Sequence, residues 1–211
     1  MIVRSSYREA VTLAMTGASG AQYGLRLLDR LLAAGERVYL MLSKPAQIVI
    51  GSETDLQLPG RPPEIARYLG ELYGAAPGQL SVFGQEEWTA PVASGSATSR
   101  AMVVCPCSMG TVASLAQGAS RTLIERAGDV MLKERRPLIV VPRETPFSTI
   151  HLENLLRLAQ AGALILPANP GFYHRPSKAE DLVDYIVARI LDHLGIEHCL
   201  GPRWGVDRPA E

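Results

Sequence analysis

The sequence predicts a doubly wound α/β fold of three layers, in which a mostly parallel β-sheet lies between two layers of helices. Along the 211 residues, short apolar runs typical of buried strands alternate with helical patterns. Three of these runs, at residues 102–105, 138–141 and 163–166, each lead into a proline that is followed by small, polar or charged residues. Ligands of open parallel sheets bind at the carboxyl ends of the strands. The polar side chains of these three turns are therefore expected to border one cleft.

The first third of the chain opens with a strand, a tight turn and a helix. Residues 10–16 form the buried-strand run, residues 17–20 form the turn, and a helical pattern continues to residue 34, where Gly35 stops it. A strand, a helix and a short helix led by proline are then expected, over residues 37–42, 45–50 and 63–73. This alternation supports the α/β assignment.

The rest of the chain continues the alternation after one irregular stretch. Residues 84–99 are rich in Ser, Gly, Ala and Thr and carry a lone Trp88, a composition typical of a mobile surface loop near a site. The expected elements are then helices at 110–116 and 123–135, the strand at 138–141, a helix at 152–161 and the strand at 163–166. A capping box from Ser177 to Glu180 predicts the start of a final helix, and Gly195 follows its end.

Length and charge limit the possible classes of protein. One domain is expected to span residues 1–211, because this length can bury a full sheet core. The tail, about residues 199–211, is too short to fold alone and is expected to pack on its own domain or on a neighbouring subunit. Lys plus Arg and Asp plus Glu are both 21, so no global charge draws the protein to nucleic acid or to an anionic membrane. No segment is as long as a bilayer span, and the first apolar run is too short for a signal peptide, which predicts a cytoplasmic protein.

The cysteines and histidines are expected to be structural. Cys105, Cys107 and Cys199 are odd in number, and a C-x-C pair without a matching Cys or His pair is poor spacing for zinc. The histidines, at positions 151, 174, 193 and 198, pair with no cysteine or acid at a telling spacing. The sequence therefore predicts no metal site.

The turn at residues 17–20, Gly-Ala-Ser-Gly, indicates the class of ligand. It lies between the first strand and the first helix, where unpaired backbone N–H groups and the helix dipole favour a phosphate. No Gly-Lys-Ser/Thr follows, Ser19 stands where a dinucleotide fingerprint has glycine, and the second strand ends at Ser43 without the acid that holds an adenosine ribose. These absences favour a mononucleotide such as FMN over NAD. A tight turn with Ser19 as a simple N-cap is the structural alternative.

Three further residues have a structural as well as a functional interpretation. Ser108 and Thr111 follow a buried strand and can either hydrogen-bond a cofactor or cap the helix that starts there. Lys133 lies in the basic end of a helix, where a cation commonly just complements the helix dipole. Taken singly, Lys133 is expected to be solvated.

The later turns favour function more strongly. Arg143 and Glu144 follow a buried strand and lie between prolines that fix the backbone, which is a typical placement of binding and catalytic residues. Tyr173 occupies the equivalent turn after the last strand. Arg189 lies at the edge of the final helix's apolar stripe, where a long side chain commonly extends its charge to solvent.

Four ordered motifs resemble those of the UbiX-type flavin prenyltransferases over nearly the whole chain. They are Gly-Ala-Ser-Gly-Ala-Gln-Tyr-Gly at 17–24, Cys-Pro-Cys-Ser-Met-Gly-Thr at 105–111, Pro-Arg-Glu-Thr-Pro at 142–146 and Pro-Ala-Asn-Pro-Gly-Phe-Tyr at 167–173. The resemblance implies a flavodoxin-like (Rossmann-like) subunit of a large homo-oligomer, commonly a dodecamer, that binds FMN between subunits. It implies metal-independent transfer of a dimethylallyl group from dimethylallyl monophosphate to N5 and C6 of reduced FMN. The prenylated FMN is then expected to pass to UbiD-type decarboxylases, in ubiquinone biosynthesis.

The resemblance also assigns roles to individual positions. The family's FMN contacts match Gly17, Ala18, Ser19, Ser43, Ser108, Met109, Gly110, Thr111 and Arg143. Its contacts to the prenyl phosphate match Lys133, Arg143, Tyr173 and Arg189, with weaker matches to the pocket at Glu53, Trp88 and Trp204. Glu144 resembles the family's acid/base, acting near Ser19 and the departing phosphate. Ser19 and Lys133 are the other two positions with an implied catalytic role.

The implied chemistry needs residues of these types. Breaking an allylic C–O bond creates a cation-like carbon and releases phosphate, which the cationic and phenolic side chains would stabilise by charge-assisted hydrogen bonds. The sequence has no Asp-rich motif of the kind that holds Mg²⁺ against a diphosphate, in agreement with a monophosphate donor. Glu144 is expected to move a proton, and the face of Trp88 to shield the allyl cation.

Two other functions remain open. One is an FMN-dependent decarboxylase of the related cysteine-decarboxylase group, which by resemblance should have a catalytic His after an early helix and a different late asparagine motif. Residues 44–60 contain no His, and the late motif here is Pro-Ala-Asn-Pro-Gly. The other is a non-catalytic flavin carrier, in which four polar residues would have no role: Lys133, Arg143, Glu144 and Arg189.

Overall fold

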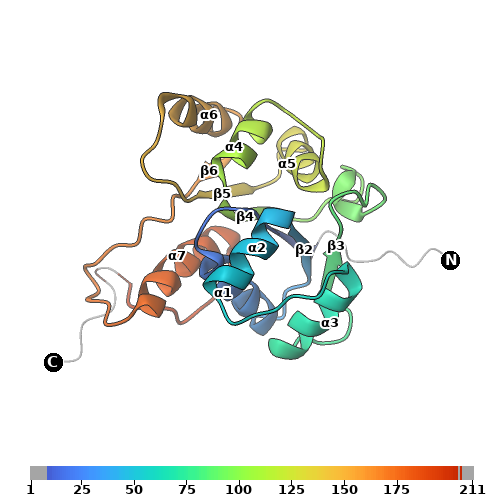
Figure 1. Cartoon of the computed structure of the whole chain (residues 1–211). Helices are drawn as coiled ribbons and strands as arrows, with labels where there is room; N and C mark the ends of the chain where they lie inside the picture. Colours follow the sequence, from blue (N-terminus) through green and yellow to red (C-terminus); the bar gives the residue numbers. More distant parts are fainter. Residues whose placement is uncertain (1–8, 204, 206–211) are drawn as a thin grey trace.

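The computed structural model describes residues 9–203 and 205 and contains a doubly wound α/β domain. Its strands are β1 (Val11–Met15), β2 (Val38–Leu42), β3 (Leu80–Phe83), β4 (Ala101–Cys107), β5 (Leu138–Pro142) and β6 (Leu164–Ile165). They form one six-stranded sheet in the order β3-β2-β1-β4-β5-β6, and every neighbouring pair is parallel (Figure 1). The chain adds strands to one side of β1 and then to the other. The switch point between β1 and β4 therefore opens a crevice at the carboxyl edge of the sheet.

Helices cover both faces of the sheet, as the sequence predicts (Figure 1). They are α1 (Ala21–Ala33), α2 (Lys44–Glu53), α3 (Pro62–Leu72), α4 (Met109–Ala116), α5 (Leu123–Lys133), α6 (Thr149–Gln160) and α7 (Ala179–Leu194), with a short 3₁₀ turn, η2, at Pro91–Ala93. The helices α1, α2, α3 and α7 pack on one face, and α4, α5 and α6 on the other. The fold is the predicted three-layer sandwich.

Alternation along the central strands produces the two halves of the core. Leu13 and Met15 of β1 belong to the cluster under α1 and α7, whereas Ala14 belongs to the cluster under α4 to α6. Every residue of β1, β2, β4 and β5 is buried. Strands that are covered on both faces read as continuous apolar runs, which is why the sequence locates them well.

The structure differs from the sequence expectation at both edges of the sheet and at the start of the final helix. The edge strand β3 was not expected, and β6 is two residues long where four were expected. Both strands are half-buried, so their sequences lack a continuous apolar run. The final helix begins one residue later than the predicted capping box, and Asp181, not Glu180, accepts from the Lys178 N–H at 3.2 Å.

The stretch at 84–99 is irregular, as expected, but its end is fixed in the core. Thr98 and Ser99 are buried, and the Ser99 hydroxyl lies 2.7 Å from that of Thr12 in β1. Arg126 of α5 donates to the Ala93 carbonyl oxygen at 2.9 Å. The expectation of a surface loop is therefore wrong for the last residues before β4.

None of the helices in the described part of the chain has the length and apolar character that a membrane crossing requires.

Candidate active site

The first turn, between β1 and α1, lies at the switch point and forms hydrogen bonds with one carboxylate side chain and one guanidinium side chain. One carboxylate oxygen of Glu53, the last residue of α2, accepts from the Gly20 and Ala21 N–H groups at 2.8 and 2.9 Å. Arg143 follows β5, and its Nε donates to the Ser19 carbonyl oxygen at 3.1 Å. Three segments that are far apart in the sequence thus meet at the carboxyl edge of the sheet.

Glu53 is the anion that the structure places at the N-terminus of α1. Burial by itself raises the pKa of Glu53, but hydrogen bonds from the Ser19 side chain and from the Ala21 and Gly20 amides, with the charge of Arg143, outweigh it and lower the pKa. The N-cap of α1 is Gly20, which has the left-handed φ of 101°. The interpretation of Ser19 as the N-cap is therefore wrong, because Gly20 holds the capping position and no side chain caps the helix.

Two neighbouring helix N-termini carry hydroxyl groups at the same edge. The Ser43 hydroxyl accepts from the Ala46 N–H at 3.1 Å at the start of α2, and the Ser108 hydroxyl accepts from the Thr111 N–H at 3.4 Å at the start of α4. Both serines are N-caps, so the capping interpretation of Ser108 is confirmed. Thr16 orients the second of these turns, since its hydroxyl donates to the Pro106 carbonyl oxygen at 3.0 Å and accepts from the Ser108 N–H at 2.7 Å.

This edge has the donor groups that the phosphate of a flavin mononucleotide needs. Helix N-termini and hydroxyls bind phosphate, and both are present at the starts of α2 and α4. A Cβ added at Gly110 in the first turn of α4 would meet no atom within 4 Å, so a ligand can approach the backbone there. At Gly17 a Cβ would lie 2.4 Å from the Cβ of Pro45, so only glycine allows the first turn to pack against α2. The residues present fit FMN.

Glu144 lies next to Arg143 at this edge. Its carboxylate accepts from the Thr145 N–H at 3.0 Å and has no other hydrogen-bond partner among the described residues. The backbone N–H of Arg143 donates to the Cys107 carbonyl oxygen at 3.3 Å, which ties this turn to the end of β4.

Cys105 and Cys107 are fully buried, and burial raises the pKa of both thiols, as expected for inert structural cysteines.

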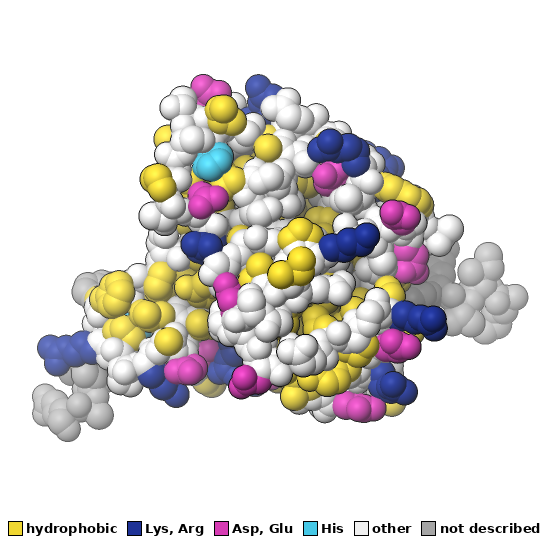
Figure 2. Space-filling view, viewed as in Figure 1, with side chains coloured by type: hydrophobic (Ala, Val, Ile, Leu, Met, Phe, Trp, Pro, Cys, Tyr) yellow, Lys and Arg dark blue, Asp and Glu magenta, His cyan; other side chains and the backbone are white. Residues whose placement is uncertain are grey.

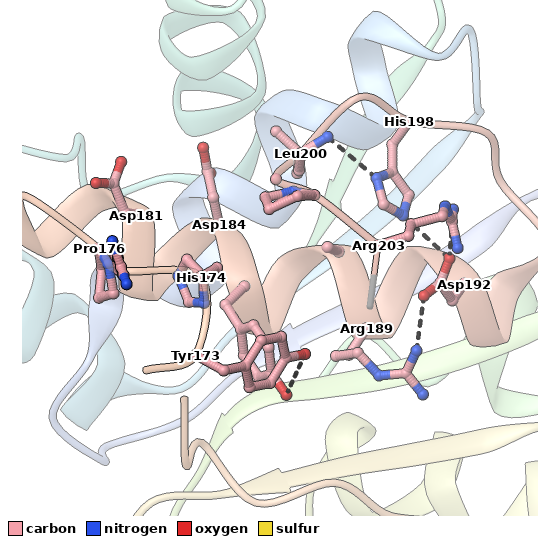
Figure 3. A pocket seen from close by; sticks show the side chains of 15 residues that line it. Tyr173, His174, Pro176, Asp181, Asp184, Arg189, Asp192, His198, Leu200 and Arg203 are labelled. Carbon is pink, nitrogen blue, oxygen red and sulfur yellow. Dashed lines mark hydrogen bonds and ion pairs between the residues drawn. The ribbon is translucent and has the colours of Figure 1, made fainter. Parts of the chain in front are cut away.

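Tyr173 and Arg189 line a different hollow, of about 640 Å³, between α7 and the chain segments on either side of it (Figure 3). The Tyr173 hydroxyl donates to that of Tyr185 at 3.4 Å, and this bond raises the pKa of Tyr173. The imidazole of His174 stacks on the Tyr185 ring at 5.4 Å, and within the described chain its two nitrogens have no hydrogen-bond partner. Arg189 Nη1 donates to Asp192 at 2.8 Å. Neither Glu53 nor Arg143 lines this hollow.

Lys133 lies at a third place, the amino edge of the sheet. It ends α5, which leads into the start of β5, and it forms an ion pair with Glu134. Nearby in the same helix, Met131 accepts a hydrogen bond from Thr98, which precedes β4. The first turn follows β1 and lies at the opposite edge. Lys133 and Ser19 of the same chain therefore lie at opposite edges of the sheet and cannot belong to the same site.

The weaker candidates have different outcomes. Glu53 is in direct contact with the first turn. Trp88 is 48 % exposed in the loop before η2, and its backbone N–H donates to the Glu86 carbonyl oxygen at 3.0 Å. Trp204 lies outside the described residues. In the described part of the chain, no group of three or more His, Cys, Asp or Glu side chains could hold a metal ion.

Several residues of these clusters were missed from sequence. Thr16 reads as part of a buried strand, and Tyr185 as part of an apolar helix stripe. The spacing of His198 revealed no acid partner, but in the structure its Nε2 lies 3.1 Å from Asp192 Oδ1. A separation of six residues across a helix end gives no periodic signal that could have revealed the pair.

Comparison with known proteins identifies the family. The family model described as Flavoprotein matches residues 3–191. The flavin prenyltransferase UbiX of Pseudomonas aeruginosa is 60% identical over 197 residues, which cover 93% of this chain and 94% of that protein. The protein of the same name from Methanothermobacter thermautotrophicus is 44% identical over 194 residues, which cover 92% of this chain and 94% of that protein.

Solved structures give the same result. A structure described as AnUbiX (PadA1) in complex with FMN and dimethylallyl pyrophosphate is 40% identical, with a TM-score of 0.84, and covers 95% of this chain and 100% of its own. A dodecameric FMN-dependent UbiX-like decarboxylase from Escherichia coli O157:H7 is 39% identical, with a TM-score of 0.82 over 92% of this chain and 98% of its own. The cysteine decarboxylase TvaF, at 20% identity and a TM-score of 0.55 over 75% of this chain and 89% of its own, shares only the fold. The chain belongs to the flavoprotein family and, within it, to the UbiX flavin prenyltransferases.

Proposed function

We propose that this protein transfers a dimethylallyl group from dimethylallyl monophosphate to reduced FMN, forming bonds to flavin N5 and C6. The observation that carries the proposal is the 60% identity, over 93% of the chain, to a flavin prenyltransferase. The structural neighbour that holds both FMN and a dimethylallyl pyrophosphate supports the two substrate classes. The reduced flavin supplies the nucleophilic N5 and C6 when it is bound.

The residues at the carboxyl edge would hold the acceptor. Ser43, Ser108 and Thr111 offer hydroxyl groups at two helix N-termini, where a phosphate monoester is favoured. Arg143 lies between the ends of β4 and β5 and is already oriented by its bond to the Ser19 carbonyl oxygen. We expect Gly17, Ala18, Met109 and Gly110 to line the backbone side of the same site.

The donor phosphate would be held by cations and a phenol. When the allylic C–O bond breaks, its electron pair leaves with the phosphate, and Lys133, Tyr173 and Arg189 would stabilise the charge on the phosphate oxygens. Glu144 would move the proton that N5 loses on bond formation, with Ser19 nearby in the same turn cluster. The Glu53 carboxylate, with its lowered pKa, remains negative and would favour the cation-like allyl carbon.

The same proposal requires several copies of the chain. Because Lys133 is at the amino edge and Ser19 at the carboxyl edge, a complete site needs residues from neighbouring subunits. Exposed apolar side chains support an oligomer: Ile150, Leu152 and Leu156 on α6 are 68%, 54% and 58% exposed. Figure 2 shows further hydrophobic side chains over the segment that leads into α7. We propose a homo-oligomer with the site between subunits, a cytoplasmic location, and a UbiD-type decarboxylase as recipient of the product.

The direct test is anaerobic incubation of the purified protein with reduced FMN and dimethylallyl monophosphate, without added metal, followed by mass analysis of the extracted flavin. A mass gain of one C5 prenyl unit with release of phosphate is expected. A parallel incubation with dimethylallyl pyrophosphate tests the choice of donor, and one without donor is the control. Unmodified flavin with both donors intact would contradict the proposal.

A second candidate function is an FMN-dependent decarboxylase. It is favoured by the description of the E. coli structure, 39% identical, as a decarboxylase. Incubation with FMN and aromatic carboxylic acids, with measurement of CO₂ release, tests it. CO₂ release by the protein alone, together with unmodified flavin in the first experiment, would favour this function over prenyl transfer.

A further inference from the structure

Asp192, near the end of α7, accepts hydrogen bonds from three donors (Figure 3). Its Oδ2 accepts from Arg189 Nη1 at 2.8 Å, one helical turn earlier. Its Oδ1 accepts from Arg203 Nη2 at 2.9 Å, and His198 Nε2 lies 3.1 Å from the same oxygen. One carboxylate thus joins Arg189, on the helix, to the segment that follows the helix.

The tautomer of His198 makes Asp192 a fixed acceptor. The Leu200 N–H donates to His198 Nδ1 at 3.2 Å, so Nδ1 carries no hydrogen and Nε2 is the nitrogen that donates to Asp192. The His198 side chain is only 7% exposed and has little freedom to move. With Oδ1 held in this way, Oδ2 faces Arg189 in one orientation.

Arg189 itself has little else to hold it. Its side chain is 49% exposed, whereas that of Asp192 is 21% exposed. Among the described residues, Nε and Nη2 of Arg189 have no hydrogen-bond partner, and the residue lines the 640 Å³ hollow with Tyr173. A long exposed arginine loses rotamer entropy when it is ordered on a ligand. A partner that orders it beforehand lowers that cost when the ligand binds.

The carboxylate remains charged in this setting. Burial by itself raises the pKa of Asp192, but hydrogen bonds from Arg203 and His198 and the charge of Arg203 outweigh it and lower the pKa. A charged acceptor forms stronger hydrogen bonds with a guanidinium than a neutral one does. Asp192 can therefore orient Arg189 through Nη1 and leave the N–H groups of Nε and Nη2 available to a ligand.

We propose that Asp192 is a positioning residue, fixed by His198, that holds Arg189 in the orientation in which its remaining N–H groups bind the phosphate of the prenyl donor. The inference rests on the proposed function, because it takes the ligand of Arg189 to be that phosphate. Asp192 also lines the hollow, but its carboxylate and the donor phosphate are both negative, so it would not bind that phosphate itself. It acts only through Arg189.

The test is Asp192→Asn, which keeps the size of the side chain and removes its charge. Loss of a charged hydrogen bond that orders Arg189 is expected to raise KM for dimethylallyl monophosphate about tenfold, with kcat changed less than about threefold. The dissociation constant of FMN is expected to stay unchanged. A second readout is the dissociation constant of dimethylallyl monophosphate for the protein loaded with oxidised FMN, measured by calorimetry, which does not depend on turnover.

Asp29 provides a matched control on another helix. It accepts from Arg26 at 2.8 Å and pairs with Arg30 at 2.9 Å, and its side chain is 20% exposed, against 21% for Asp192. Asp29 does not line the hollow. Asp29→Asn therefore removes a comparable charge from a comparable cluster and is expected to leave donor binding within about twofold of the parent protein.

A second background separates positioning from a merely structural role. In a protein that carries Arg189→Ala, adding Asp192→Asn is expected to cause no further loss of donor affinity, because the residue through which Asp192 acts is gone. A further loss in that background would overturn the inference and assign the effect to the segment after α7. Unchanged donor affinity of Asp192→Asn in the parent background would also overturn it.

The outcomes for the inference and for the proposed function are distinguishable. If no prenylated flavin forms but Asp192→Asn still weakens donor binding by calorimetry, the proposed function fails and the inference stands. If Asp192→Asn does not fold, as judged by thermal unfolding and FMN binding, Asp192→Glu is used, which keeps the charge but moves it by one methylene. An increase of about threefold in the donor dissociation constant is then expected, and an unchanged constant would overturn the inference.

Discussion

At the scale of single residues, the first turn has a negative side chain on one side and a positive side chain on the other. Glu53 supplies a negative charge to the N-terminus of α1, and Arg143 donates to the Ser19 carbonyl oxygen on the other side of the turn. The sequence predicted a phosphate at this helix N-terminus, on the strength of the glycines and the helix start, but in the structure the Glu53 carboxylate accepts from its N–H groups. That the anion is a carboxylate 33 residues further along the chain depends on how α2 packs, which no local pattern reports.

Glu53→Gln is expected to lower the free energy of unfolding by about 1 kcal/mol at neutral pH, because the charge at the N-terminus of α1 is lost. The folded-state pKa of Glu53 is lowered, so its contribution is complete above the ordinary carboxyl range. It disappears as the pH falls below that range through the folded pKa. Urea unfolding at stepwise lower pH, at fixed protein concentration, measures the difference.

The control for this prediction is Glu71→Gln. Glu71 is an exposed residue of α3 with no hydrogen-bond partner among the described residues, so its replacement is expected to change stability little at any pH. A difference between Glu53→Gln and the parent that persists at the lowest pH would assign the effect to packing and not to charge.

Glu144→Gln is expected to slow prenyl transfer about a hundredfold, because an amide cannot take the proton that N5 loses. FMN binding should be unchanged, since the Glu144 carboxylate accepts only from the Thr145 N–H within the described chain. Single-turnover formation of prenylated flavin and FMN titration measure the two quantities. Glu153→Gln, at an exposed position of α6, is the control. Normal turnover by Glu144→Gln would remove Glu144 from the mechanism.

At the scale of elements, the sequence located what is buried on both sides and missed what is not. The central strands and the helices that cover them were predicted within a few residues, because their apolar patterns are continuous or periodic. The edge strand β3 is half-buried, and its Leu80–Phe83 pairs only with β2, so nothing in its composition separates it from a loop. The sequence also did not predict where two elements approach each other closely, although glycines stand at several such places.

Gly24 of α1 is the clearest of these approaches. An added Cβ would lie 2.4 Å from the Cys105 carbonyl oxygen and 2.6 Å from Met15 Cε. Because the first of these atoms is backbone, Gly24→Ala is expected to force α1 away from β4 and to destabilise the fold by about 2–3 kcal/mol. Gly70→Ala in α3, where an added Cβ has only one ordinary contact at 3.8 Å, is the control and should stabilise by about 0.5–1 kcal/mol. Urea midpoints that shift equally for both would contradict this account.

At the scale of the whole molecule, the predicted site residues are divided among separate parts of the surface. Ser19 and Arg143 lie at the carboxyl edge, Tyr173 and Arg189 line the hollow at α7, and Lys133 lies at the amino edge. The sequence predicted the residue types and the turns that carry them. It could not predict the distances between them, because these depend on how copies of the chain are placed around each other. The proposed subunit interface is thus a requirement of the chemistry as well as of the exposed apolar surface.

This requirement predicts that two inactive variants complement each other. Lys133→Met and Glu144→Gln should each be poorly active as pure oligomers. In oligomers assembled from equal amounts of both, about a quarter of the sites would combine an intact Lys133 from one subunit with an intact Glu144 from another, for random mixing. The rate of prenylated-flavin formation should rise accordingly.

The reciprocal experiment mixes the double variant Lys133→Met/Glu144→Gln equally with the parent protein. About a quarter of the sites are then intact if the two residues come from different subunits, and about half if they come from one subunit. No gain in the first mixture and half activity in the second would place both residues in one chain, and α5 would then have to lie elsewhere than the sheet edge at which β5 begins.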